Sequence, residues 1–100
     1  MPRQTPPLEK TMTAQETYRA ALYAREAAFV AFAAAERQAA IVCEDSAEAA
    51  LRYDHLRTPE TEAAANAADE AAFHATVALR QAETALAQAE ADVQEAKENL

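Results

Sequence analysis

The 100-residue chain contains no Gly and no Trp, and it has only one Cys and one Ser. Glycine is the residue that most readily adopts the positive φ angles of tight hairpin turns, so its absence disfavours a β-sheet protein. Gly-rich loops that bind phosphate groups are excluded as well. The single cysteine, Cys43, cannot form an internal disulfide, so nothing in the sequence favours an oxidising compartment.

Long apolar segments and an excess of positive charge are also missing. No stretch reaches the roughly 18 uninterrupted apolar residues that a membrane span needs. The first residues, with Pro2, Pro6 and Pro7, lack the apolar segment of a signal peptide. The net charge is −8 with only nine Lys and Arg, so the chain is poorly suited to neutralise phosphates of nucleic acid or of an anionic membrane. We therefore expect a cytoplasmic protein that binds neither nucleic acid nor membrane directly.

The residues that are abundant favour helices. Ala makes up 30 of the 100 residues, and it is the best helix former because it loses no side-chain entropy in a helix. A bias toward Ala, Glu, Leu, Lys and Arg is typical of long helices and coiled coils. Because large apolar residues are sparse, a lone hairpin would bury little area. We therefore expect very close helix packing or self-association.

Capping signals divide the chain into an arm and two helices. Residues 1–12 are expected to form a flexible arm, and Thr13 with Glu16 fits a capping box. In Thr58-Pro59, Thr58 suits an N-cap and Pro59 suits the first helical position. The elements expected are a single helical domain over 13–100, with helix 1 at about 14–57 and helix 2 at about 59–98.

The predicted fold is all-α, a long antiparallel helical hairpin with coiled-coil-like Ala/Leu packing. One alternative stays open: Cys43–Ser46 could cap a new helix, which would break helix 1 and give a three-helix arrangement.

The apolar patterns of the two helices differ. Helix 2 carries Leu79, Leu86, Val93 and Leu100 seven residues apart, with Ala75, Ala82, Ala89 and Ala96 between them. Helix 1 has a looser stripe of Tyr18, Leu22, Phe29, Ala33, Ala40, Ala47 and Leu51. Phe32, Ile41 and Val42 lie partly off that stripe, so helix 1 has a wider apolar surface than one partner helix covers. A homodimer in the form of a four-helix bundle would bury Phe29, Phe32, Ile41 and Val42.

Candidate catalytic and metal-binding residues are few. His55 and His74 are the only histidines, and neither stands in a metal-binding motif. Cys43 and His55 are twelve residues apart on a helix, about 18 Å, which is too far for an activated thiol. We expect Cys43 to be a buried or half-buried structural residue, and the protein to be a non-enzyme without cofactor or metal.

Negative charge is concentrated in the second half of the chain. Residues 59–100 carry nine acidic residues against Arg80 and Lys97, a net charge of −7. Solubility of a slim bundle is one interpretation. The other is recognition of a basic, nucleic-acid-binding protein, with these contacts: Glu83, Glu90, Asp92 and Glu95.

In size and hairpin plan the chain resembles the secreted WXG-type helical hairpins, although the Trp-x-Gly turn is absent. In its small size and acidity it is similar to phage-encoded inhibitors of bacterial defence complexes, including anti-CRISPR proteins, which share no common motif. The high Ala content fits a GC-rich bacterium or its phage. The function expected is that of a non-catalytic protein-interaction factor, an acidic inhibitor of a basic nucleic-acid-binding complex. The alternative is a structural homo-oligomeric coiled-coil or helical-bundle protein.

Overall fold

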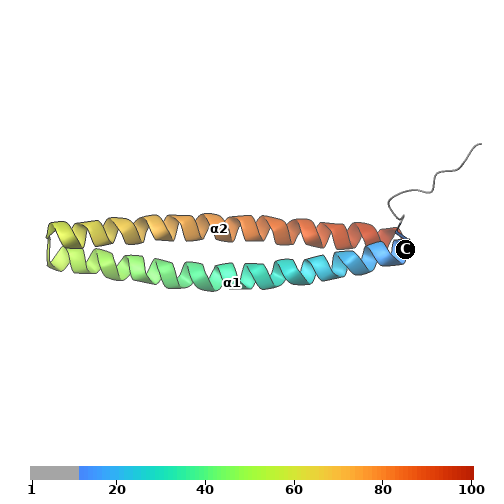
Figure 1. Ribbon diagram of the computed structural model, residues 1–100, viewed down its shortest axis with the longest axis horizontal. Helices are drawn as coiled ribbons and strands as arrows, with labels where there is room; N and C mark the ends of the chain where they lie inside the picture. Colours follow the sequence, from blue (N-terminus) through green and yellow to red (C-terminus); the bar gives the residue numbers. More distant parts are fainter. Residues whose placement is uncertain (1–11) are drawn as a thin grey trace, which may run out of the picture.

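A computed structural model describes residues 12–100 and shows two long helices side by side in an antiparallel hairpin (Figure 1). Helix α1 spans Ala14–His55 and helix α2 spans Pro59–Glu98. The described part of the chain contains no strand. The predicted all-α hairpin is confirmed. The expected flexible arm, except for Met12, lies outside the described residues.

Helix α1 passes through Cys43–Ser46 without interruption, so the three-helix alternative is wrong. No Pro or Gly breaks the chain at this point, and alanines on both sides favour continuation of the helix.

The N-terminus of α1 has the predicted capping box. The Glu16 amide donates to Thr13 Oγ1 at 3.1 Å, and the Thr13 amide donates to Glu16 Oε1 at 2.9 Å. The helix ends at His55, two residues before the expected end.

The turn between the helices consists of three residues and needs no glycine. Leu56 and Thr58 are both extended, with φ of −138° and −122°, and no residue of 12–100 has a positive φ. A capping box then starts α2: the Thr61 amide donates to Thr58 Oγ1 at 3.1 Å and the Thr58 amide donates to Thr61 Oγ1 at 3.0 Å. The Thr61 hydroxyl also donates to the Leu56 carbonyl, which ties the end of α1 to the start of α2. Pro59 occupies the first turn of α2, where no backbone donor is required.

We predict that Thr58→Ala lowers the free energy of unfolding by about 1 kcal/mol, because the N-cap acceptor is lost. Thr84→Ala is the matched control. The Thr84 hydroxyl bonds only the Arg80 carbonyl of its own helix, and Ala has the higher helix propensity, so this variant should be neutral or slightly more stable. Urea unfolding followed by circular dichroism measures both. Equal losses in the two variants would contradict a special role for the cap.

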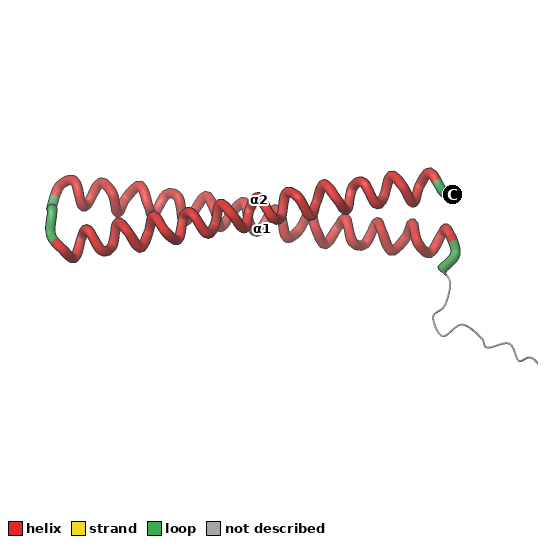
Figure 2. The backbone as a smooth tube through the Cα atoms, turned by 90° about the horizontal axis from the view of Figure 1, so that it is seen from above, coloured by secondary structure: helices red, strands yellow, loops and turns green. Residues whose placement is uncertain are grey.

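The helices meet along a seam with a seven-residue repeat. In α1 the buried and half-buried residues include Tyr18, Ala21, Ala28, Phe32, Ala35, Ala39, Val42, Ser46, Ala49 and Tyr53; in α2 they include Thr61, Ala65, Ala68, Ala72, Ala75, Leu79, Ala82, Leu86, Ala89, Val93 and Ala96. Spacings of three and four alternate, which is the coiled-coil pattern. Such a repeat makes the helices wind around each other. Figure 2 shows them crossing near the middle of the hairpin.

Large and small residues alternate across the seam. In an antiparallel pair, residues equally far from the turn at Arg57 lie level with each other. Leu86 is therefore level with Ala28, and Phe32 is level with Ala82. A small residue opposite each large one lets the helix axes approach closely. The residues that are buried rather than half-buried are Ala39, Ala89, Val93 and Ala96.

The looser stripe expected in α1 is confirmed at Tyr18, Leu22 and Ala33, which are half-buried, and is wrong at its other four positions. Phe29 and Leu51 are 56% and 59% exposed, and Ala40 and Ala47 are also exposed. That stripe connects large apolar residues and alanines at a period of 3.6. The seam instead follows a period of 3.5 and runs through small residues such as Ala39 and Ser46.

We predict that Ala39→Leu destabilises the hairpin by about 1–3 kcal/mol, because the added side chain forces the helices apart at a buried position. Ala40→Leu adds the same atoms to an exposed position and should change stability by less than about 0.5 kcal/mol. Thermal or urea unfolding of the two variants under the same conditions checks this. The opposite order would favour the stripe through Ala40 over the seam through Ala39.

Candidate interaction surface

The two histidines and the single cysteine all lie exposed on the hairpin. No group of three or more His, Cys, Asp and Glu within residues 12–100 is arranged to hold a metal ion. His74 Nε2 lies 3.7 Å from Glu70 Oε1, and both side chains are well exposed. Cys43 is exposed, so its expected structural burial is wrong. Across residues 12–100, neither helix has an apolar stretch long enough to cross a membrane.

We predict that the Cys43 thiol reacts with a thiol-specific reagent in the native protein at a rate close to that in urea, because the hairpin does not cover it. The helix content should not change on labelling. Absorbance of the released reagent group measures the rate. A native rate slower by more than about tenfold would show that Cys43 is covered in solution.

The hairpin has two long edges, one on each side of the seam between α1 and α2. The Phe29 edge is lined by Leu22, Tyr23, Arg25, Glu26, Phe29, Leu86 and Glu90. The Asp92 edge is lined by Thr17, Ala20, Ala21, Asp92, Glu95, Ala96 and Asn99. Glu90 and Asp92 are two residues apart, which rotates their directions by about 200° around α2. The two edges therefore lie on opposite sides of the seam.

This geometry separates the four acidic residues expected to form one contact face. Glu83 lies seven residues before Glu90, so both project toward the Phe29 edge. Asp92 and Glu95 project toward the Asp92 edge. All four are exposed. A flat partner can contact one pair or the other, but not all four together.

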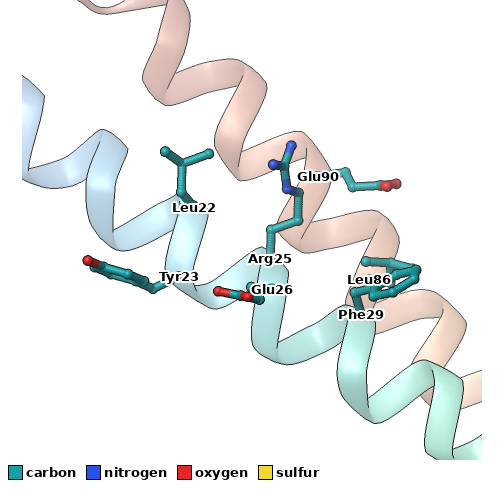
Figure 3. Close-up of a pocket in the computed structure, with 7 residues that line it drawn as sticks. All are labelled: Leu22, Tyr23, Arg25, Glu26, Phe29, Leu86 and Glu90. Atoms are coloured by element: carbon teal, nitrogen blue, oxygen red, sulfur yellow. The ribbon is translucent and has the colours of Figure 1, made fainter.

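The Phe29 edge contains a groove of about 550 Å³ that is lined by apolar residues and by charges of both signs (Figure 3). Leu22 and Leu86 are half-buried, whereas Phe29 is 56% exposed. Arg25 stands seven residues from both Tyr18 and Phe32, so it occupies a seam position although it is charged. Its side chain points toward α2 in Figure 3. The seven-residue repeat of α1 identifies Arg25 as a seam position from the sequence alone, whereas the looser stripe does not include Arg25.

A second groove continues the Phe29 edge toward the open end of the hairpin. Its lining consists of Ala14, Gln15, Tyr18, Arg19, Leu22 and Leu100. Because Leu22 lines both grooves, they adjoin each other along this edge.

The Asp92 edge differs in charge. Its groove, of about 480 Å³, contains two carboxylates and no cation among its lining residues. Ala20 and Ala21 add no atoms beyond Cβ to its lining. The Asp92 carboxylate accepts a hydrogen bond from Gln88 Nε2 at 2.9 Å.

The residues expected to form the packing and oligomer seam divide into two groups. Leu79, Leu86, Val93, Phe32 and Val42 lie in the seam. Phe29 and Ile41 are 56% and 58% exposed and lie outside it. Phe29 and Ile41 differ by twelve residues, about 120° around the helix, so they lie on different sides of α1.

Comparisons of the chain with protein-family models, with curated proteins and with solved structures each found no match.

Proposed function

We propose that the protein is a non-catalytic protein-interaction factor, an acidic helical rod that binds a basic, nucleic-acid-binding partner and occludes it. The observation that supports this proposal is the set of exposed carboxylates on α2. Nine acidic residues stand against Arg80 and Lys97, and within residues 12–100 the one side-chain contact of salt-bridge distance made by α2 joins Glu70 to His74. Carboxylates without cationic neighbours attract a basic surface and raise its association rate.

The Asp92 edge fits a basic partner better than the Phe29 edge does. Asp92 and Glu95 lie in a groove without a cation, so a Lys or Arg of the partner meets only negative charge there. On the Phe29 edge, Arg25 offsets part of the negative charge of Glu26 and Glu90. The short side chains of Ala20 and Ala21 on the Asp92 edge also let a partner backbone approach closely.

The charge density of α2 indicates which part its carboxylates play in binding a partner. Duplex DNA carries one negative charge per about 1.7 Å of axis. Residues 59–100 carry a net charge of −7 along a helix of roughly 60 Å, about one charge per 9 Å. Helix α2 is therefore far less charged than the nucleic acid it would displace. In this proposal the carboxylates steer and orient the encounter, and packing of the rod against the partner supplies the rest of the affinity.

We predict that Asp92→Lys with Glu95→Lys abolishes capture of a basic nucleic-acid-binding protein from nuclease-treated host lysate, measured by affinity pull-down and mass spectrometry in a salt series. Positive residues near the C-terminus of α2 complement the helix dipole, so helix content should be preserved.

The matched control is Glu83→Lys with Glu90→Lys, which changes the total charge equally on the opposite edge and should retain most of the capture. If capture survives both double reversals, the acidic residues are not contacts and the charge-based proposal is wrong. If both variants lose it equally, total charge matters rather than the Asp92 edge.

A structural homo-oligomer is the second candidate, and the exposure of large apolar residues favours it. More than a third of the residue surface is exposed at Met12, Tyr23, Phe29, Val30, Ile41, Leu51, Leu56, Phe73, Val77 and Leu100. A rod with so many exposed apolar residues gains by covering some of them. The two candidates are compatible, because a homodimer can also bind a basic partner.

A further inference from the structure

We propose that a jump in the seven-residue repeat across the turn commits this chain to a closed hairpin, so that copies of the protein do not exchange α2. Exchange is the alternative that a helical hairpin has to exclude, because α1 of one copy can pack against α2 of another with the same seam contacts. The inference concerns how the hairpin is specified, and it depends on no property of a basic partner.

An extended dimer is the exchanged form with the same pairing of seam residues. In it the turn is helical, each chain is one long helix, and two chains lie antiparallel. Residues equally far from Arg57 are level in the hairpin, and a two-fold axis at Arg57 brings the same residues together from two chains. Leu86 is then level with Ala28 of the other copy. The pairing of seam residues alone therefore does not distinguish the hairpin from this dimer.

The rotation of the seam around each helix does distinguish them. The seam residues nearest the turn are Ser46, Ala49 and Tyr53 in α1 and Thr61, Ala65 and Ala68 in α2. Ser46 and Ala65 hold equivalent positions, because each is followed by a seam residue three places on. Three whole repeats after Ser46 end at Ala67, so the repeat of α2 begins two residues early. At about 103° per residue for a period of 3.5, this displacement rotates the seam by about 150° around the helix.

A continuous helix through the turn therefore has its two seams on nearly opposite faces. One antiparallel partner lies along one face, so it covers the seam of α1 or the seam of α2 but not both. The extended dimer would leave half of each chain without a partner helix. In the hairpin the jump has no such cost, because the turn reverses the chain and lets α2 take its own rotation.

Exchange through a hinge that is not helical avoids the rotation but loses the turn. In the closed hairpin the Thr61 hydroxyl donates to the Leu56 carbonyl and the Thr61 amide donates to Thr58 Oγ1. A straightened hinge separates Leu56 from Thr61, so the tie between the helices is lost in both copies. The hairpin alone keeps both the seam and this tie. Each edge then consists of residues from one chain, and any self-association joins closed hairpins.

Insertions at the turn test the proposal. The helix break is first removed in the full chain with Thr58→Ala and Pro59→Ala. Two alanines added after Arg57 then bring α2 into phase with α1, whereas four alanines at the same place leave it two residues out of phase in the other direction. Both inserted segments consist of the best helix former, so the variants differ mainly in phase.

Energy transfer between the two ends of one chain reports the exchange. Labels are placed with Gln15→Cys and Asn99→Cys in a Cys43→Ser background, at the ends of α1 and α2 that lie together in the hairpin (Figure 1). The labelled chain is refolded from urea with an excess of unlabelled chain at high micromolar concentration, so that contacts between copies do not contribute. In the extended dimer the two labels lie about 130 Å apart, at about 1.5 Å per residue.

The wild-type chain and the four-alanine variant should show high transfer, and the two-alanine variant should lose at least about 80% of it. Circular dichroism on the same samples checks that the helices persist. The proposal is overturned if the wild type loses transfer, or if the two-alanine variant does not lose more of it than the four-alanine variant.

Discussion

Close contact between α1 and α2 across an alanine seam is the interaction on which the rest of the structure depends. Each large seam residue has a small residue level with it, as Leu86 has Ala28 and Phe32 has Ala82. Close approach brings many backbone and Cβ atoms into contact, and dispersion contacts that are individually weak add up along the whole hairpin. Because the seam consists largely of alanines, it also limits how much apolar surface the hairpin buries. Only Ala39, Ala89, Val93 and Ala96 are buried in the described part of the chain, so the seam excludes water without forming a large core.

This slim construction determines where function can reside. The two largest grooves described above lie along its Phe29 edge, and a further groove lies along its Asp92 edge. The Phe29 edge combines apolar residues with charges of both signs. The Asp92 edge has carboxylates among alanines, which suits a basic partner. Since the edges lie on opposite sides of the seam, self-association on one leaves the other accessible.

The sequence predicted the fold well because its strongest signals are local. The Thr13–Glu16 capping box, the Thr58-Pro59 helix start and the seven-residue repeat of Leu79, Leu86 and Val93 each depend on neighbouring residues of one helix. The turn needed no glycine, because Leu56 and Thr58 adopt extended conformations that any residue can adopt.

The interaction surface was harder to predict, because it depends on how each helix is rotated toward the other. Large apolar residues indicated a stripe through Phe29 in α1, whereas the helix turns Ala39 and Ser46 inward. A small difference in assumed period, 3.6 against 3.5, is enough to move Phe29 from the seam to an edge. The same rotation separates Glu83 and Glu90 from Asp92 and Glu95, although all four belong to one helix.

A single hairpin buries only four residues in its described part, and in the homo-oligomer candidate it is stabilised by covering exposed apolar residues with another copy. Thermal unfolding measured as a function of protein concentration tests this most directly, because association of folded chains raises the unfolding midpoint by mass action. The account predicts a midpoint that rises steadily from low to high micromolar concentration. A high midpoint that does not change with concentration would show that a single hairpin is sufficient, and it would contradict the claim.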